Sequence, residues 1–182
     1  MLGMFGRGRH ERVGFQLYTQ AVHAARQPYF YAALGVPDTL DGRFDLVGLY
    51  ACMVIQRLRA MPPKGPRVAQ AVFDAMFSDM DINLREMGVS DMAIAKKVRA
   101  MWEAFHGRAV AYEAPLANHD AAALADALSR NVWRGEAAPG AAAIGRIATA
   151  QMQALEQAPA TELLAGRLDF GAPEIFDRAV AA

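Results

Sequence analysis

The stretch Leu46-Val-Gly-Leu-Tyr-Ala-Cys-Met-Val-Ile55 is the longest uninterrupted apolar run of the chain, and it is bounded by Asp45 and Gln56. A helix that crosses a bilayer needs about 20 apolar residues, so this run is too short to span one. A helix that is apolar nearly all round is typical of the buried middle of a bundle. We therefore predict a central buried helix that starts near residues 38–42 and ends before Pro62.

Turn residues and helical spacing divide the rest of the chain into further helices. Alanine is abundant and favours helix, and no alternating run of β-branched residues indicates a strand. The other expected segments cover about residues 10–26, 28–31, 67–88, 90–115, 118–133, 140–157 and 161–168. The predicted fold class is all-α, a single helical bundle of about six or seven helices. We expect a flexible N-terminus over residues 1–9 and one helical domain over 10–182, in which alanine-rich helices over 118–182 lean on the earlier ones.

The spacing of large apolar side chains predicts which faces enter the core. The first helix carries Phe15, Tyr18 and Val22 on one face, the third has Phe73, Phe77, Met80, Leu84 and Met87, and the fourth has Ile94, Val98, Met101 and Phe105, with Trp102 beside them. Asp81 and Arg85 are four residues apart, which predicts an ion pair along one helix face. Gly88 is expected to end the third helix, and Gly107 is a possible interruption of the fourth.

Composition and charge exclude several classes of function. The chain has 182 residues, 54% of them hydrophobic, and its 19 basic and 19 acidic residues balance. A balanced chain has no overall field for nucleic acid, so no nucleic-acid partner is predicted. Arg7, Arg9 and Arg12 predict a solvated terminus, with contact to an anionic surface as the alternative. One cysteine and no visible signal peptide fit a cytoplasmic address, with peripheral contact at the inner membrane left open.

The residues for catalysis or metal binding do not assemble into a motif. Cys52 lies within the most apolar stretch, where a thiol is expected to be buried and inert. A di-iron bundle needs Glu-x-x-His on two helices, but the sequence has only Glu103-Ala-Phe-His106. Asp79 and Asp81 point nearly 200° apart on a helix, so they do not converge on one ion. We therefore predict no enzyme, no metal and no cofactor.

Several ordered blocks carry a resemblance to a known family. They are Phe73-Asp-Ala-Met-Phe-Ser-Asp-Met-Asp81, Leu84-Arg-Glu-Met-Gly-Val89, Lys96-Lys97, Glu103-Ala-Phe-His-Gly-Arg108 and Ala111-Tyr112, preceded by Arg26-Gln-Pro-Tyr-Phe-Tyr31, Leu34-Gly-Val-Pro37 and Asp41-Gly-Arg-Phe-Asp45. Over roughly residues 12–116, the chain resembles the ubiquinol–cytochrome c chaperone family, which assembles respiratory complex III. The tail after Pro115 carries little of this signature.

The resemblance implies a non-catalytic assembly chaperone of a bacterial type. Its partner would be cytochrome b or another complex III subunit, with a small helper protein as a further candidate. The alternatives are a helical interaction or scaffold module and, less favoured, a metal- or quinone-binding bundle.

The resemblance also implies partner-binding residues, each of which has a structural role as its alternative. They are Asp79, Asp81, Arg85, Glu86, Lys97, Gly107, Arg108 and Tyr112. A client-binding chaperone usually exposes an apolar groove. The candidates for its surface are Tyr29, Phe30, Tyr31, Met76, Met80, Met87 and Met92, although core packing is the preferred role for most of the methionines.

Overall fold

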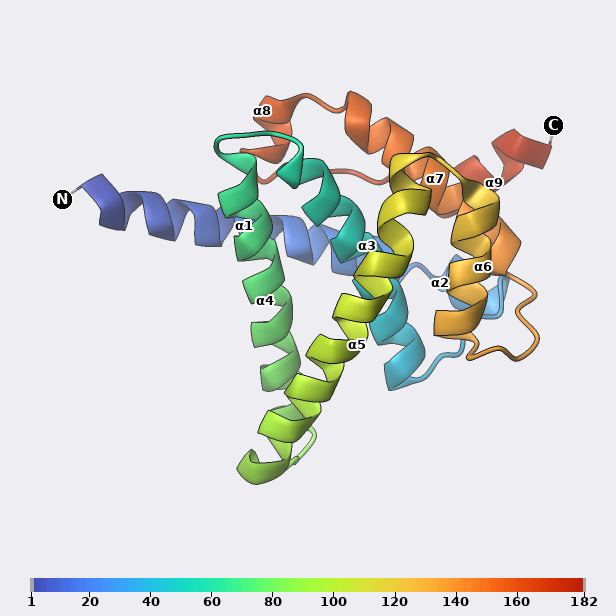
Figure 1. The fold of residues 1–182 in the computed structure, drawn as a ribbon, viewed down its shortest axis with the longest axis horizontal. Coiled ribbons are helices and arrows are strands. Elements are labelled where there is room, and N and C mark those ends of the chain that lie inside the picture. The colour runs from blue at the N-terminus through green and yellow to red at the C-terminus, as the bar shows by residue number, and fades with distance from the viewer. Residues whose placement is uncertain (1, 182) are drawn as a thin grey trace.

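A computed structural model describes the backbone of residues 2–181 and the side chains of residues 8–177. This part of the chain contains helices and no strand, which confirms the all-α prediction (Figure 1). The helices are α1 (Leu2–Ala25), α2 (Pro28–Ala32), α3 (Leu40–Arg59), α4 (Gly65–Glu86), α5 (Asp91–Ala117), α6 (Ala121–Val132), α7 (Ala141–Gln157), α8 (Ala160–Leu163) and α9 (Pro173–Ala181). Only α2 and α8 are shorter than nine residues.

Helix α3 is the buried centre that its apolar run predicts. Every residue from Asp45 to Ile55 is buried, and Leu46, Leu49 and Met53 are completely so. The helix begins after Thr39, whose hydroxyl accepts a hydrogen bond from the Gly42 amide at 3.1 Å. This N-cap satisfies one of the free amides of the first turn. The other long helices pack around α3 (Figure 1).

Helices α1 and α4 cross at a close contact. A methyl group on Gly14 would lie 2.5 Å from the Ala71 Cβ and 2.6 Å from the Ala71 backbone carbon. Glycine therefore lets the two backbones approach to a distance that no larger residue permits. Beyond the crossing, the Tyr18 hydroxyl of α1 donates a hydrogen bond of 2.7 Å to Asp79 of α4.

Helices α4 and α5 form a hairpin whose closed end projects from the body of the molecule (Figure 1). Gly88 ends α4 with a positive φ of 76°, as the sequence predicts, and Ser90 precedes α5. Leu84 and Ile94 are buried within this hairpin, one on each helix. Met87 follows the end of α4 and is exposed, so its predicted place in the core stripe is wrong.

Helix α5 is longer than the sequence pattern suggests. It continues through Gly107 and through Pro115 to Ala117. One glycine within a helix costs about 1 kcal/mol, and buried Phe105 and Tyr112 anchor the helix on either side of Gly107. Packing therefore outweighs the local signal for a break.

The C-terminal helices share one core with the earlier ones. One cluster of buried side chains extends from Val13 to Phe170. The Tyr50 hydroxyl of α3 donates to the Gln151 side chain of α7 at 2.7 Å, and the Trp133 indole donates to the Gly35 carbonyl at 3.0 Å. These two contacts join residues after position 118 to α3 and to the loop before it.

Two segments differ from the boundaries that the sequence predicts. Helix α1 starts at Leu2 rather than near His10, and residues 173–181 form α9, for which no helix is expected. The division into a flexible segment 1–9 and a domain 10–182 stays a prediction. Within the described residues, no helix has both the length and the apolar character needed to cross a membrane.

Candidate functional site

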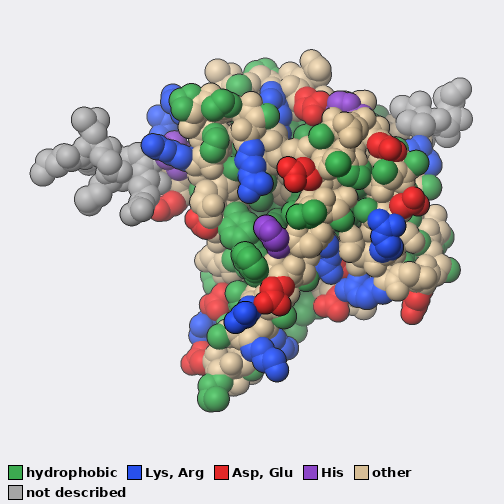
Figure 2. All heavy atoms as spheres, viewed as in Figure 1, with side chains coloured by type: hydrophobic (Ala, Val, Ile, Leu, Met, Phe, Trp, Pro, Cys, Tyr) green, Lys and Arg blue, Asp and Glu red, His purple; other side chains and the backbone are tan. Residues whose placement is uncertain are grey.

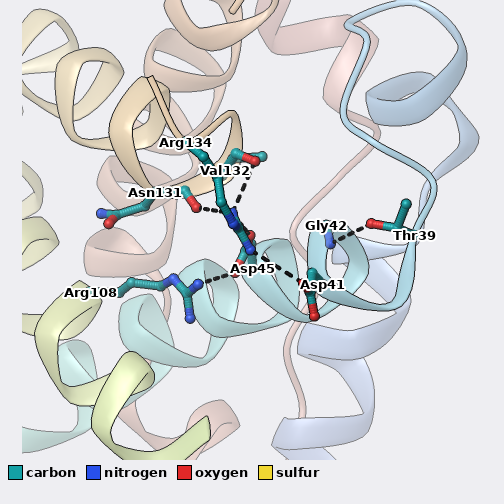
Figure 3. Close-up of polar contacts among 8 residues, drawn as sticks. All are labelled: Thr39, Asp41, Gly42, Asp45, Arg108, Asn131, Val132 and Arg134. Atoms are coloured by element: carbon teal, nitrogen blue, oxygen red, sulfur yellow. Dashed lines mark hydrogen bonds and ion pairs between the residues drawn. The ribbon is translucent and has the colours of Figure 1, made fainter. Parts of the chain in front are cut away.

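A buried carboxylate joins three parts of the fold beside the central helix. Asp45 of α3 is completely buried, and its two oxygens contact arginines from different elements (Figure 3). Arg108 of α5 lies 2.7 Å from Oδ1, and Arg134, which follows α6, lies 3.0 Å from Oδ2. Asp41 lies 3.7 Å from Arg134 at the exposed edge. The cluster thus holds α5 and the end of α6 against α3.

Burial dominates the electrostatics of this cluster. Loss of hydration raises the pKa of the Asp45 carboxyl above its usual value, although Arg108 and Arg134 both act to lower it. Burial also raises the pKa of the Tyr112 hydroxyl, with a further contribution from the Asp45 charge. An ion pair removed from water contributes little net stability while it is intact, but losing one partner leaves a charge uncompensated. The cluster is therefore sensitive to any change that moves α5.

Arg134 has a second role in this cluster. Its guanidinium Nη1 donates to the carbonyls of Asn131 and Val132 at the end of α6 (Figure 3). A cation that donates to the last carbonyls of a helix satisfies free acceptors and complements the helix dipole. The Arg134 backbone has φ of 56°, a conformation that costs energy in a residue other than glycine. The side-chain contacts offset that cost.

The sequence-predicted site residues fall into separate places. Arg108 and Tyr112 lie in the Asp45 cluster, where Arg108 also lies 5.5 Å over the Phe44 ring. Arg85 forms the predicted pair with Asp81 at 2.7 Å and a second pair with Asp91, which ties α4 to α5. Arg108 and Tyr112 therefore stabilise the fold from the interior. The ion pairs of Arg85 stabilise the α4–α5 hairpin at its surface.

The other predicted site residues lie elsewhere on the surface. Glu86 and Lys97 are exposed on the projecting hairpin. Gly107 is exposed in the middle of α5, so its alternative role as a helix-end glycine is wrong. Asp79 lies on the other side of α4, where it contacts α1 through Tyr18. From the predicted set, the structure thus brings Arg108 and Tyr112 together in the Asp45 cluster and pairs Asp81 with Arg85 on the hairpin, and it does not gather all eight residues at one site.

An apolar groove opens where α4 and α5 converge over α3. Its volume is about 220 Å³, and its lining includes Phe73, Phe105, Ala109 and Val110. Figure 2 shows hydrophobic side chains gathered on this face around a histidine. Val110 is 63% exposed, so a strongly apolar residue at the groove faces solvent. We refer to this surface as the α4–α5 groove.

Phe73 and Phe105 line the α4–α5 groove, and further aromatic rings lie against its lining residues. The Phe73, Phe77 and Phe105 ring centroids lie 4.7–6.0 Å apart. Trp102 is 44% exposed, and its ring stacks on His106, with ring centroids 5.3 Å apart. Rigid aromatic surfaces of this kind bind apolar partners with little loss of conformational freedom.

Most of the aromatic and methionine candidates from the sequence are not at this surface. Phe30 is completely buried against Tyr50, while the Tyr29 and Tyr31 hydroxyls bond to Asp177 and to the Ala25 carbonyl. Met76 and Met80 fill the core, as preferred for most methionines, whereas Met87 and Met92 are exposed on the hairpin. The prediction of an exposed aromatic groove at residues 29–31 is therefore wrong.

The geometry of the possible reactive groups is unfavourable for chemistry. Burial raises the pKa of the Cys52 thiol to about 12, which keeps it protonated at neutral pH. The exposed Glu103 side chain pairs with Arg99 at 3.1 Å. Within the described residues, no three His, Cys, Asp or Glu side chains gather as a metal site would require.

Asp45 and Arg134 are absent from the sequence-predicted site. One feature of the sequence indicates that Asp45 is unusual: it is a charged residue directly before the longest apolar run. A charge in that position needs a buried partner, but the sequence does not show which cation supplies it. Arg134 lies in the loop after α6, and only the packing of α6 against α3 and α5 brings it to Asp45.

Known proteins resemble this chain over most of its length. A model of the ubiquinol-cytochrome C chaperone family matches residues 32–170. Ubiquinol-cytochrome-c reductase complex assembly factor 1 of Xenopus laevis is 25% identical over 117 residues, and the mitochondrial protein CBP3 of Saccharomyces cerevisiae is 34% identical over 110 residues. These alignments cover 64% and 59% of this chain, and 58% and 32% of the two relatives.

A solved structure agrees with the fold. The crystal structure of the Cbp3 homolog from Brucella abortus matches with a TM-score of 0.82 and 33% sequence identity, over 95% of this chain and 97% of that one. The family match extends to residue 170, so it includes α6 and α7, beyond the region that carries the motif resemblance. It also includes the Asp45 cluster and every residue that lines the α4–α5 groove. Since the matched region is well over half of the sequence, the chain belongs to the ubiquinol-cytochrome C chaperone family.

Proposed function

We propose that this protein is a non-catalytic assembly chaperone of ubiquinol–cytochrome c reductase. Its client is cytochrome b or another apolar subunit of that complex, with a small helper protein as a further partner. The observation that carries the proposal is the family match, because it includes every residue that lines the α4–α5 groove. The Xenopus relative is named for assembly of the same complex. We expect the protein to act in the cytoplasm, with peripheral contact at the inner membrane where its client inserts.

The α4–α5 groove suits an apolar client segment. The exposed side chains of Trp102 and Val110 lose contact with water when a client covers them, and apolar burial contributes about 25 cal/mol per Å². Arg59, His106 and Glu113 also line the groove, so polar groups are available at its edge. A groove that holds an apolar segment by contact alone needs no reacting group.

The Asp45 cluster supports this binding surface from behind. Arg108 is separated by one residue from Val110, and its ion pair with Asp45 anchors this part of α5 to α3. Tyr112, two residues beyond Val110, is completely buried. We infer that Arg108 and Tyr112 act on client binding through the position of α5, whereas exposed residues of the groove contact the client.

The test is affinity capture of the tagged protein from mildly crosslinked, detergent-solubilised cells of its own host, with partners read by mass spectrometry. We expect cytochrome b or other complex III subunits to be enriched over abundant membrane proteins. Val110→Glu should abolish this enrichment, because it places a charge at the apolar groove. Ile175→Glu is the matched control, since Ile175 is equally exposed, at 65%, but lies on α9.

Two results would contradict the proposal. Capture of soluble partners alone, with complex III subunits at background, would favour the interaction or scaffold module instead. Enrichment that survives Val110→Glu and is lost with Ile175→Glu would place the client on a different surface. Circular dichroism of both variants checks that the helical fold is intact.

A further inference from the structure

A second apolar groove lies between α1 and α4, away from the α4–α5 groove. Its volume is about 340 Å³, and Ala71, Ala75 and Ser78 of α4 form part of its lining. Phe15 of α1 and Ile82 of α4 also line it, and they are 59% and 50% exposed. Phe15 is thus turned outward, contrary to its predicted place on the core face of α1. The molecule leaves a large aromatic and a large aliphatic side chain in water at one site.

The charged residues that line this second groove are all acidic. Glu11 belongs to α1, and Asp74 and Asp79 belong to α4. Gln70 donates to Asp74 at 2.7 Å, and Tyr18 donates to Asp79 at 2.7 Å, so both carboxylates have oriented neutral donors. Among the described residues, none of the three forms an ion pair. We refer to this surface as the acidic groove.

We propose that the acidic groove binds an amphipathic helix of a partner protein, with apolar residues on one face and Lys or Arg along its edges. The apolar face would cover Phe15 and Ile82, and the cations would pair with Glu11, Asp74 and Asp79. Helix-in-groove recognition uses this combination of spaced apolar anchors and complementary charge. This partner differs from the client of the α4–α5 groove, whose lining carries both charge signs.

The same charges disfavour other occupants. Carboxylates repel the phosphates of nucleic acids and of anionic lipid surfaces. A second copy seated symmetrically would bring its own three carboxylates against these three, because a two-fold interface apposes identical patches. A basic amphipathic helix is therefore the occupant that the groove complements in both shape and charge.

The experiment measures binding of designed peptides to the full chain by fluorescence anisotropy. The probe is a fluorescein-labelled peptide of about 14 residues, or four helical turns, with leucine on one face and lysine on the other. Its counterpart replaces each lysine by glutamate. We expect the lysine peptide to bind at least about tenfold more tightly and to weaken as salt rises, because exposed charges are screened.

Matched variants locate the binding site. The double variant Glu11→Gln/Asp74→Asn should weaken binding of the lysine peptide by about tenfold, since each exposed pair contributes up to about a fivefold effect. Phe15→Ser should also weaken it. Asp126→Asn/Glu136→Gln is the control, because both of these acidic residues are exposed on other elements.

Three outcomes would overturn the inference. They are unchanged affinity in the Glu11→Gln/Asp74→Asn variant, equal binding of the glutamate peptide, and loss of binding with Trp102→Ala instead, which would place the peptide in the α4–α5 groove. Analytical ultracentrifugation provides a fourth test. A dimer that dissociates in the Glu11→Gln/Asp74→Asn variant would show that a second copy occupies the acidic groove.

Discussion

Asp45 shows how much one buried charge depends on residues far away in sequence. The carboxylate is completely buried, and its partners Arg108 and Arg134 come from α5 and from the loop after α6. Folding must remove Asp45 from water and then compensate its charge through contacts that form only in the tertiary structure. At the residue scale, this dependence makes the Asp45 cluster vulnerable to the loss of either arginine.

Arg108→Ala should lower the free energy of unfolding by about 3 kcal/mol, because it leaves a buried carboxylate with one partner. Arg85→Ala is the matched control, since Arg85 is exposed and its ion pairs lie in water. Urea denaturation followed by circular dichroism measures both variants. If Arg108→Ala unfolds at the same urea concentration as the wild type, the structural role is wrong. Arg108 would then be assigned to partner contact, the role that the family resemblance implies.

The cost of Arg108→Ala should depend on pH. Arg108 acts to lower the Asp45 pKa, so its removal raises that pKa further. The folded variant then binds its proton more readily than the folded wild type, and its relative stability falls as pH rises. We expect the difference in unfolding free energy to be smaller near pH 4 than at pH 7. A difference that grows at low pH would contradict this origin.

A third prediction at the residue scale concerns Cys52. Its thiol is buried and has a pKa of about 12, so little thiolate forms at neutral pH. A thiol-specific reagent should therefore leave the native protein unmodified for hours and react fully with one thiol after denaturation in guanidinium. Rapid modification of the native protein would show that the α4–α5 groove, which Cys52 lines, opens readily.

Two glycines separate the effects of helix propensity from those of helix packing at the element scale. Gly14 lies at the α1–α4 crossing, whereas a methyl group at Gly107 would meet nothing within 4 Å. Gly14→Ala should lower the unfolding free energy by about 1–3 kcal/mol, the usual cost of forcing extra atoms into packed helices. Gly107→Ala should raise it by up to about 1 kcal/mol, because alanine favours helix.

Thermal unfolding of both glycine variants tests this contrast. The melting temperature should fall for Gly14→Ala and rise for Gly107→Ala. The double variant Gly14→Ala/Ala71→Gly should recover part of the loss, since the Ala71 Cβ is the nearest atom to the added methyl group. Equal effects at the two positions would mean that the α1–α4 crossing is not closely packed in solution.

At the scale of the whole molecule, the two tryptophans report on different regions. Trp133 is buried and its indole is bonded to Gly35, whereas Trp102 is partly exposed at the α4–α5 hairpin. Acrylamide should quench Trp102 strongly and Trp133 weakly, as measured with Trp133→Phe and Trp102→Phe respectively. Binding of an apolar client segment in the α4–α5 groove should shift Trp102 emission to shorter wavelength and protect it from quenching. An unchanged Trp102 signal with a bound client would contradict that placement.

The sequence predicted most of the helices because their signals are local. Helices can be identified without knowledge of distant contacts from their capping residues, from Gly88 and from the apolar run 46–55. The errors arise where a local rule and packing disagree. Helix α5 continues through Gly107 because its neighbours Phe105 and Tyr112 are buried, and Phe15 lies outside the core because α1 and α4 cross at Gly14.

Patterns within the amino-acid sequence are sufficient to predict the all-α class, the buried central helix and, through ordered motifs, the family. Those properties depend on hydrophobic periodicity and on residues close together in the chain. Which residues meet depends instead on the folded arrangement of the helices. Examples are Asp45 with Arg108 and Arg134, Phe73 with Phe105 at the α4–α5 groove, and the three acidic residues around Phe15. The physical reason is that burial and charge pairing depend on how helices cross, and crossing geometry follows from side chains on every helix at once.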